Sequence, residues 1–176
     1  PDAPTLPFQI GADSREAQYA LVGAEIHSEV YEWAENLTCP YTTSSACMEV
    51  VQEQAPTTKH RGSFRLHNRE SISFNYEQRK EDPQVAHSFV LEVDEYNQVR
   101  KNCAVAYPRR EALIDEQEVL HCSAEEITLR NQIEEGEARM LGVGIESKSF
   151  EILGLAAPKM LYYKYEELKK QLLEEG

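Results

Sequence analysis

Hydrophobic and polar residues alternate with a period of two in three runs at the middle of the chain, residues 70–77, 85–93 and 99–107. Successive side chains of a strand point to opposite faces, so this period places the apolar residues of each run on one face. A break at 81–83 separates the first two runs, because its proline fixes φ and cannot donate to a ladder. We predict three long antiparallel strands, each with one buried face. The in-phase positions are Ile72, Phe74, Tyr76, Val85, Phe89, Leu91, Val93, Val99, Cys103, Val105 and Tyr107.

The second and third runs are joined at Tyr96-Asn97-Gln98. Asn97 tolerates the positive φ that a tight hairpin loop requires, whereas Gln98 tolerates it less well. We therefore expect a hairpin whose turn is looser than the two-residue form.

The N-terminal part of the chain predicts one short helix and one strand. Asp13 is a plausible N-cap for a helix over 14–22, Glu16 completes a capping-box-like pattern, and Gly23 ends the helix. Residues 24–33 favour a strand, although a helix that continues to the end of this range fits the apolar spacing nearly as well.

Further β segments surround the central runs. A polar loop is expected at 54–62 and a solvated turn at Glu134-Glu135-Gly136-Glu137. No internal repeat is present. The additional strand predictions are Cys47–Gln52, a strand beginning at Phe64 and Leu66, a strand within 119–130 around Ile127, and one within 148–153 with Phe150 and Ile152 in phase.

The C-terminus changes to a helical pattern after Pro158, and Glu166 and Lys170 lie one turn apart as an exposed ion pair. A single helix gains most of its stability from tertiary packing, so we expect its apolar stripe to pack on the sheet rather than bind a partner. The stripe consists of Leu161, Tyr165, Leu168 and Leu172.

Composition limits the classes of function. The chain has 176 residues, 41% hydrophobic and 28% charged, and this is ordinary for a soluble globular protein. Its net charge of −13 opposes binding to phosphate backbones and anionic lipid. No run approaches the roughly 18 apolar residues of a membrane-spanning helix. The start, PDAPTLPFQI, lacks the pattern of a signal peptide and predicts an extended Pro-rich segment, so we expect the chain to begin inside a longer protein.

The cysteines do not predict a metal site. Cys39, Cys47, Cys103 and Cys122 form no C-x-x-C pair, and only His121 lies beside a cysteine. Adjacent residues of a strand point to opposite faces, so His121 and Cys122 cannot readily share an ion. Two disulfides are compatible with the even count, but we favour reduced thiols that pack as small hydrophobic residues.

Candidate catalytic groups are few, and we expect no catalytic, cofactor-binding or metal-binding residues. Glu92, Asp94 and Glu95 cluster at the predicted hairpin tip, where acids are usually solvated. His87 is in phase with the apolar face and favours a satisfied core histidine. Gly142-Val143-Gly144 lacks the third glycine and the strand–helix context of a dinucleotide site. Arg109-Arg110 is predicted to be a solvated strand terminus rather than an anion site.

Several blocks of the sequence match one known family: NRESISFNYE, EDPQVAHSFVLEVDEY, CAVAYPRR, LVGAEIHSEVYEW, CPYTTSSACMEVVQEQ and MLGVGIESKSFEILGL. On these blocks the chain resembles the B component of the bacterial insecticidal toxin complexes, the Tc toxins. The blocks cover roughly residues 20–155 in the family's order, which isolated motifs do not achieve by chance. The chain departs from the family at Asn97-Gln98, where a Gly-Asn turn is usual, and in the acidic stretch 111–118.

This resemblance implies a mainly β, antiparallel segment of a larger component, with a short N-terminal helix and one C-terminal helix. We expect an extended lead-in at 1–12, a sheet region at 13–155, and a linker and helix at 156–176. The family's B and C components build an Rhs-type shell that holds the unfolded toxic part of the C component. The family's B component also docks on the pore-forming A component.

The implied role is containment of the toxic effector in a secreted virulence complex. Its partners are the rest of the B component, the C component and, indirectly, the A component, without nucleic acid, cofactor or direct membrane contact. The alternative is an independent β-rich adaptor that pairs its strand edges with a protein partner.

Overall fold

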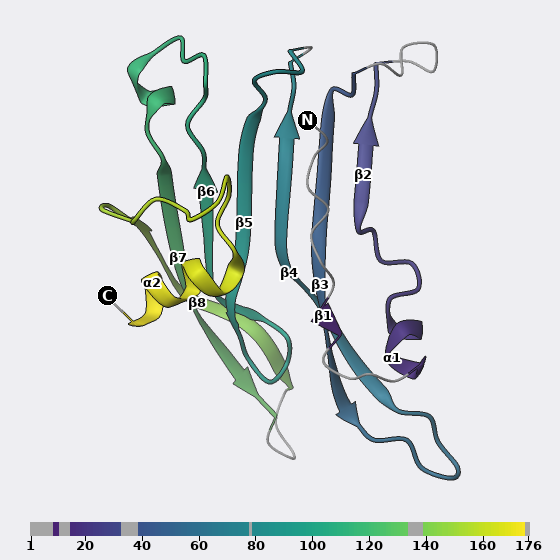
Figure 1. The fold of residues 1–176 in the computed structure, drawn as a ribbon. Coiled ribbons are helices and arrows are strands. Elements are labelled where there is room, and N and C mark those ends of the chain that lie inside the picture. The colour runs from purple at the N-terminus through teal and green to yellow at the C-terminus, as the bar shows by residue number, and fades with distance from the viewer. Residues whose placement is uncertain (1–8, 11–14, 33–38, 78, 134–138, 175–176) are drawn as a thin grey trace. The chain divides into compact units, whose positions relative to one another are not determined.

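The structure is a computed structural model that describes residues 9–10, 15–32, 39–77, 79–133 and 139–174. It is mainly β, with a short N-terminal helix and a C-terminal helix, as predicted (Figure 1). None of the described helices is long and apolar enough to cross a membrane. The elements in chain order are β1 (Gln9–Ile10), α1 (Arg15–Ala20), β2 (His27–Val30), β3 (Thr42–Gln54), β4 (Ser63–Asn75), β5 (Gln84–Val93), β6 (Val99–Ala106), a 3-10 helix (Asp115–Glu118), β7 (His121–Gln132), β8 (Met140–Glu151) and α2 (Tyr165–Glu174).

The strands follow the order β1-β3-β4-β5-β6-β7-β8, and β2 also pairs with β3. The chain divides into two compact units. Unit 1 contains Pro1–Ser88 and Ala106–Leu120, and unit 2 contains Phe89–Val105 and His121–Gly176. Strands β5 and β6 therefore contribute residues to both units.

Unit 1 is organised around the long antiparallel pair β3–β4 (Figure 1). Its register runs from Thr42↔Asn75 to Gln54↔Ser63. A shift between Cys47 and Met48 leaves Arg69 as an extra residue on β4, a β-bulge. Because the bulge interrupts the alternation, Arg69 and Glu70 are both buried although they are adjacent. β2 pairs antiparallel with the start of β3, and β1 pairs parallel with it near Val50.

Unit 2 combines the antiparallel pair β7–β8 with helix α2. Tyr165 packs its ring against Phe89, with the centroids 6.4 Å apart, and its hydroxyl donates to the carbonyl of Val90 at 2.9 Å. Leu168 is fully buried. The apolar stripe of α2 therefore packs on the sheet of its own unit, and this prediction is confirmed.

The three central strands are confirmed, with Ile72, Phe74, Phe89 and Cys103 among the buried residues. The hairpin turn is looser than two residues, also as expected. Asn97 has φ +64, and the N–H of Asp94 donates to the carbonyl of Gln98 at 2.9 Å. This arrangement matches a three-residue loop in which a turn is followed by one left-handed residue.

The N-terminal predictions were partly right. Helix α1 spans Arg15–Ala20, and Gly23 follows it with φ +86, whereas Asp13 lies outside the described residues. The strand predicted in 24–33 is the shorter His27–Val30, and the helical alternative for that range is wrong.

Two strands are longer than predicted. β3 begins at Thr42 rather than Cys47. The prediction missed this part of the strand because its buried residues Thr43 and Ser45 are polar, and the apolar pattern does not detect them. β8 begins at Met140 rather than near Lys148. The β7–β8 register shifts between Thr128 and Leu129 of β7, so Ile145 is an extra residue on β8 and interrupts its alternation. The predicted turn at 134–137 lies outside the described residues.

The C-terminal helix is shorter than the pattern indicated. It begins at Tyr165, so Leu161 precedes it and is exposed. Two contacts hold the preceding segment outside the helix. The hydroxyl of Tyr163 donates to the carbonyl of Ala156 at 2.6 Å, and the N–H of Lys159 donates to the carboxylate of Glu167 at 3.1 Å.

Candidate functional site

The buried polar group of unit 1 is built from Glu70, His87 and Tyr107. Glu70 lies in phase with the buried Ile72 and Phe74 of β4, and β5 presents His87 beside it. Nε2 of His87 lies 2.9 Å from Oε1 of Glu70, and Nδ1 lies 3.1 Å from the hydroxyl of Tyr107. His87 is only 1% exposed. It is a satisfied core histidine, as predicted.

This carboxylate–imidazole–hydroxyl series is chemically able to pass a proton. Glu70 and His87 lie in the core, however, where the imidazole is closed to a substrate, and Tyr107 is half-buried. Buried polar groups that are fully paired fix the register of the elements that carry them. The group therefore joins β4, β5 and the segment that follows β6.

A second cluster in unit 1 corrects the prediction for Arg109-Arg110. The Arg109 side chain is 6% exposed rather than solvated, and its Nε lies 3.1 Å from Oδ2 of Asp82. Its Nη1 lies 3.2 Å from Glu77, and its Nη2 donates to the carbonyl of Asp82 at 3.0 Å. Arg110 is exposed, but its backbone N–H donates to Asp82 at 2.9 Å.

Burial by itself would raise the pKa of Asp82. The N–H of Arg110, the guanidinium of Arg109 and the N–H of Glu111 outweigh burial and lower the pKa of this carboxyl. The guanidinium is occupied by protein carboxylates, so the cluster ties the turn before β5 to the segment after β6. It is not arranged as an open anion site.

The hairpin tip of unit 2 also differs from the prediction. Glu92 and Glu95 are exposed, but Asp94 is half-buried. Its Oδ1 accepts the backbone N–H groups of Tyr96 and Gln98, both at 2.9 Å. Its Oδ2 accepts Nδ2 of Asn131 at 2.9 Å. Asp94 shapes the turn and is not one of a group of solvated acids.

Burial opposes the ionisation of Asp94, but these donors outweigh it and lower its pKa. The same contacts continue into β8. Oδ1 of Asn131 accepts the backbone N–H of Gly142 at 2.8 Å, and Gly142 has φ +69. A Cβ at position 142 would lie 3.0–3.2 Å from the side-chain amide of Gln98. The first glycine of Gly142-Val143-Gly144 is therefore a packing position against the hairpin turn.

The cysteines form no disulfide. Cys103 and Cys122 are buried, and their thiol groups form a hydrogen bond with each other. This bond and burial raise the pKa of Cys103, and the same bond lowers the pKa of Cys122. His121 is exposed whereas Cys122 is buried, as expected for opposite faces of a strand. Within the described residues no three His, Cys, Asp or Glu side chains gather closely enough to hold a metal ion.

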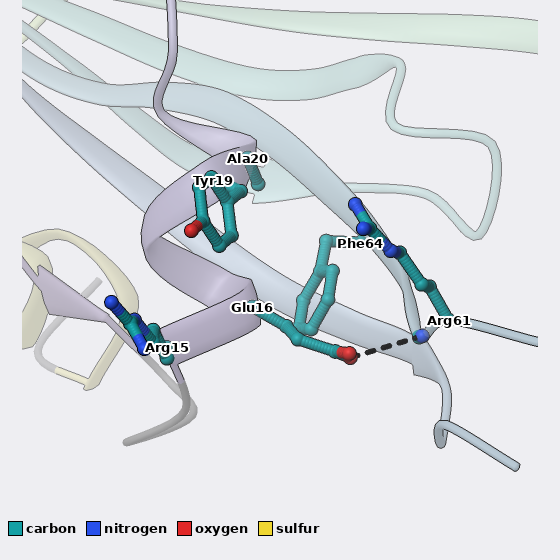
Figure 2. A pocket seen from close by; sticks show the side chains of 7 residues that line it. Arg15, Glu16, Tyr19, Ala20, Arg61 and Phe64 are labelled. Atoms are coloured by element: carbon teal, nitrogen blue, oxygen red, sulfur yellow. Dashed lines mark hydrogen bonds between the residues drawn. The ribbon is translucent and has the colours of Figure 1, made fainter. Parts of the chain in front are cut away.

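A hollow of about 480 Å³ lies between helix α1 and the start of β4 in unit 1. Figure 2 shows the carboxylate of Glu16 bonded to the backbone N–H of Gly62, at 3.1 Å. Arg15 and Arg61 lie on opposite sides of the Glu16 side chain and do not converge on a common point (Figure 2). The hollow therefore lacks a focused set of ligand-binding groups. Its lining is Arg15, Glu16, Tyr19, Ala20, Arg61, Gly62 and Phe64.

The surface that sequence analysis missed is strand β8 of unit 2. All twelve residues of β8 are exposed, including several apolar ones. An alternating apolar strand is normally interpreted as having one buried face, so its pattern did not reveal an open surface.

Comparisons with known proteins agree with the sequence resemblance. The sequence model of the family described as "Insecticide toxin TcdB middle/C-terminal region" matches residues 16–143. None of the curated proteins matches the chain. The fold is similar to the crystal structure of TcdB2-TccC3 without hypervariable C-terminal region, with a TM-score of 0.65 and 22% identity. It is also similar to the crystal structure of TcdB2-TccC3, with a TM-score of 0.64 and 20% identity.

Each of these matches covers 82% of this chain and 8% of the solved chain. The chain thus spans a small part of the length of the proteins that it matches. Neither the family match nor the fold match indicates a catalytic role.

Proposed function

The chain belongs to the insecticide toxin TcdB middle/C-terminal family, and from that premise we propose that it forms part of the wall of a hollow protein shell. In this proposal the whole chain is one β-rich segment of a larger B component. That component and a TccC-like C component enclose the toxic effector before its delivery. The complex acts outside the producing cell.

The observation that carries the proposal is the similarity in fold to TcdB2-TccC3 across 82% of the chain. The side-chain contacts of the described residues are consistent with a wall. Glu70–His87, Asp82–Arg109 and Asp94–Asn131 each join separate segments of the chain. A wall functions through its geometry, because paired strands satisfy backbone groups and separate two spaces.

Two adjacent positions of β8 test whether the sheet separates an inside from an outside. Lys148 and Ser149 are both exposed and, as neighbours in a strand, point to opposite faces. Each is replaced singly by cysteine in a Cys39→Ser background, in the complete B component assembled with its C component. Labelling uses a maleimide that carries a polymer too large to pass through a closed wall.

The proposal predicts that the bulky maleimide labels only one of the two positions in the complex. A small maleimide, the matched control, should label both, and both reagents should label both positions in the 176-residue chain. Equal labelling of both positions by the bulky reagent in the complex would show that this sheet does not divide two compartments.

An independent adaptor is the second candidate, and the open edge of β8 is the observation that favours it. An adaptor should be a stable monomer with one cooperative melting transition and should bind a protein partner without the rest of the B component. Light scattering and calorimetry on the 176-residue chain measure both properties. A chain that is poorly protected from hydrogen exchange or that associates favours the wall segment.

A further inference from the structure

Two buried thiols of unit 2 lie in contact across neighbouring strands. Cys103 belongs to β6 and Cys122 to β7, and these strands are adjacent in the sheet. Cys103 is 1% exposed and Cys122 is 2% exposed, and their thiol groups form a hydrogen bond with each other. The fold therefore brings two sulfur atoms together although their residues lie 19 positions apart in the sequence.

The spacing of the strands suits a covalent bond between these sulfur atoms. Neighbouring strands of a sheet lie about 4.8 Å apart. A disulfide joins residues whose Cα atoms are about 4.4–6.8 Å apart and holds the two sulfur atoms at about 2.05 Å. The backbones of β6 and β7 are thus within reach of such a bond.

The two thiols differ in how readily they ionise. The hydrogen bond with Cys103 lowers the pKa of Cys122 by more than burial raises it. The same hydrogen bond and burial raise the pKa of Cys103. The thiolate is the nucleophilic form of cysteine, so Cys122 is the thiol that reacts first.

A buried tyrosine lies beside the pair. Tyr163 is 2% exposed, and its hydroxyl donates to the carbonyl of Ala156 at 2.6 Å. Burial raises the pKa of Tyr163, and the negative charge of a thiolate at Cys122 raises it further, so the two side chains are close. The segment before α2 therefore restricts access to the thiols, and only a small reagent can reach them in the native chain.

We propose that Cys103 and Cys122 are a modification site at which a disulfide forms between β6 and β7, with a small peroxide as the oxidant. The thiolate of Cys122 attacks one oxygen of hydrogen peroxide and becomes a sulfenic acid, and the hydroxide that leaves takes up the proton released by Cys122. The sulfur of Cys103 then attacks the sulfenic sulfur. The S–S bond forms, and the sulfenic hydroxyl leaves as water with the proton of Cys103. In total, two thiols become one disulfide and one hydrogen peroxide becomes two waters.

The setting of this reaction rests on the proposed function, in which the complex acts outside the producing cell. Disulfides form and persist in such oxidising surroundings and are rare in the reducing cytosol. The bond itself depends only on contacts within unit 2.

The position of the pair in the chain gives the bond a mechanical consequence. The chain leaves unit 2 after Val105 and returns to it at His121. Cys103 and Cys122 lie next to these two points, so the disulfide closes the intervening segment into a covalent loop. Closing a loop of this length restricts the unfolded chain, and the melting temperature should rise by roughly 5–10 °C.

Peptide mapping by mass spectrometry without reduction tests the bond in the complete B component. Trypsin separates the two residues, because Cys103 falls in peptide 102–109 and Cys122 in peptide 111–130, while the other two cysteines share peptide 16–59. After the reduced component is treated with hydrogen peroxide, peptides 102–109 and 111–130 should appear as one linked species that dithiothreitol separates. Oxidised cysteines without this linked species overturn the proposal.

Melting of the 176-residue chain supplies an independent readout. Peroxide should raise the melting temperature of the wild type and of the control Cys39→Ser, and dithiothreitol should reverse the rise. Cys122→Ala retains Cys103 but lacks its partner, so its melting temperature should not rise. An equal rise in Cys122→Ala contradicts the cross-link. Peptide mapping needs no substitution and decides the question if Cys122→Ala does not fold.

The wall is tested separately by maleimide labelling at Lys148 and Ser149. A linked peptide together with equal bulky labelling of both positions removes the wall and leaves the disulfide intact. Labelling of one position only, without a linked peptide, removes the disulfide and leaves the wall intact.

Discussion

The substitution Asp82→Asn removes a charge that the fold has desolvated and paired. Asp82 is 6% exposed and accepts hydrogen bonds from Arg109 Nε at 3.1 Å, Arg110 N–H at 2.9 Å and Glu111 N–H at 3.3 Å. A hydrogen bond to a charged group contributes about 1.5–3 kcal/mol, against about 0.5–1.5 kcal/mol for a neutral pair. The free energy of unfolding should therefore fall by about 1 kcal/mol for each of the three bonds, or about 3 kcal/mol in total.

The free energy of unfolding is measured by urea denaturation followed by circular dichroism. The control is Glu81→Gln, which removes the same charge from the neighbouring exposed residue and should change stability by about 0.5 kcal/mol or less. A loss of about 3 kcal/mol corresponds to a fall in melting temperature of roughly 6–12 °C for a chain of this size.

The direction of the pKa shift of Asp82 determines how its contribution to the free energy of unfolding changes with pH. The folded-state pKa of Asp82 lies below its unfolded value, so its contribution is fully present above the unfolded pKa of about 3.9. The contribution is lost as the pH falls through the folded pKa, because both states then bind the proton. The difference between wild type and Asp82→Asn should therefore be largest at neutral pH and shrink below about pH 4.

Two results would refute this reasoning. One is an Asp82→Asn variant that is as stable as Glu81→Gln at neutral pH. The other is a stability difference between Asp82→Asn and wild type that stays constant as the pH is lowered from 7 to well below the unfolded pKa.

Three further predictions concern other parts of the structure. Gly142→Ala should destabilise the chain by about 1–2 kcal/mol, because the φ of Gly142 is +69 and the new Cβ meets the Gln98 amide. The control Gly144→Ala has open space around it and should leave the free energy of unfolding nearly unchanged in the same urea titration. Tyr107→Phe should cost about 1 kcal/mol through its lost bond to His87, and a loss near zero in thermal melts would contradict that contact. A thiol reagent should modify only Cys39 fast in the native, reduced chain and all four cysteines in denaturant. Fast modification of any cysteine in the native Cys39→Ser variant would count against the burial of the other three.

The central strands were predictable because their alternation reports directly on one buried face. Ile72, Phe74 and Phe89 lie in phase and are buried. The limits of β3 were not predictable in this way, since Thr43 and Ser45 are polar residues buried by their neighbours. The bulge that buries both Arg69 and Glu70 depends on the pairing of β4 with β3, which local periodicity does not contain.

The candidate site shows the same division. His87 was correctly interpreted because its phase alone places it in the core. Arg109 was misinterpreted because its partner is remote in sequence, and for Asp94 the remote partner adds to two local turn contacts. Arg109 bonds to Asp82, 27 residues earlier, and Asp94 bonds to Asn131, 37 residues later. The exposure of β8 was missed because an apolar strand at an edge has the same pattern as an apolar strand in a core.

The most direct test of the central claim is a cryo-electron microscopy map of the complete B component assembled with its C component. The account predicts that strands β3 to β8 form part of a β-sheet wall that faces an enclosed space on one side. A map in which this segment is a separate domain outside the shell, or lines a cleft that binds a small substrate, would contradict it.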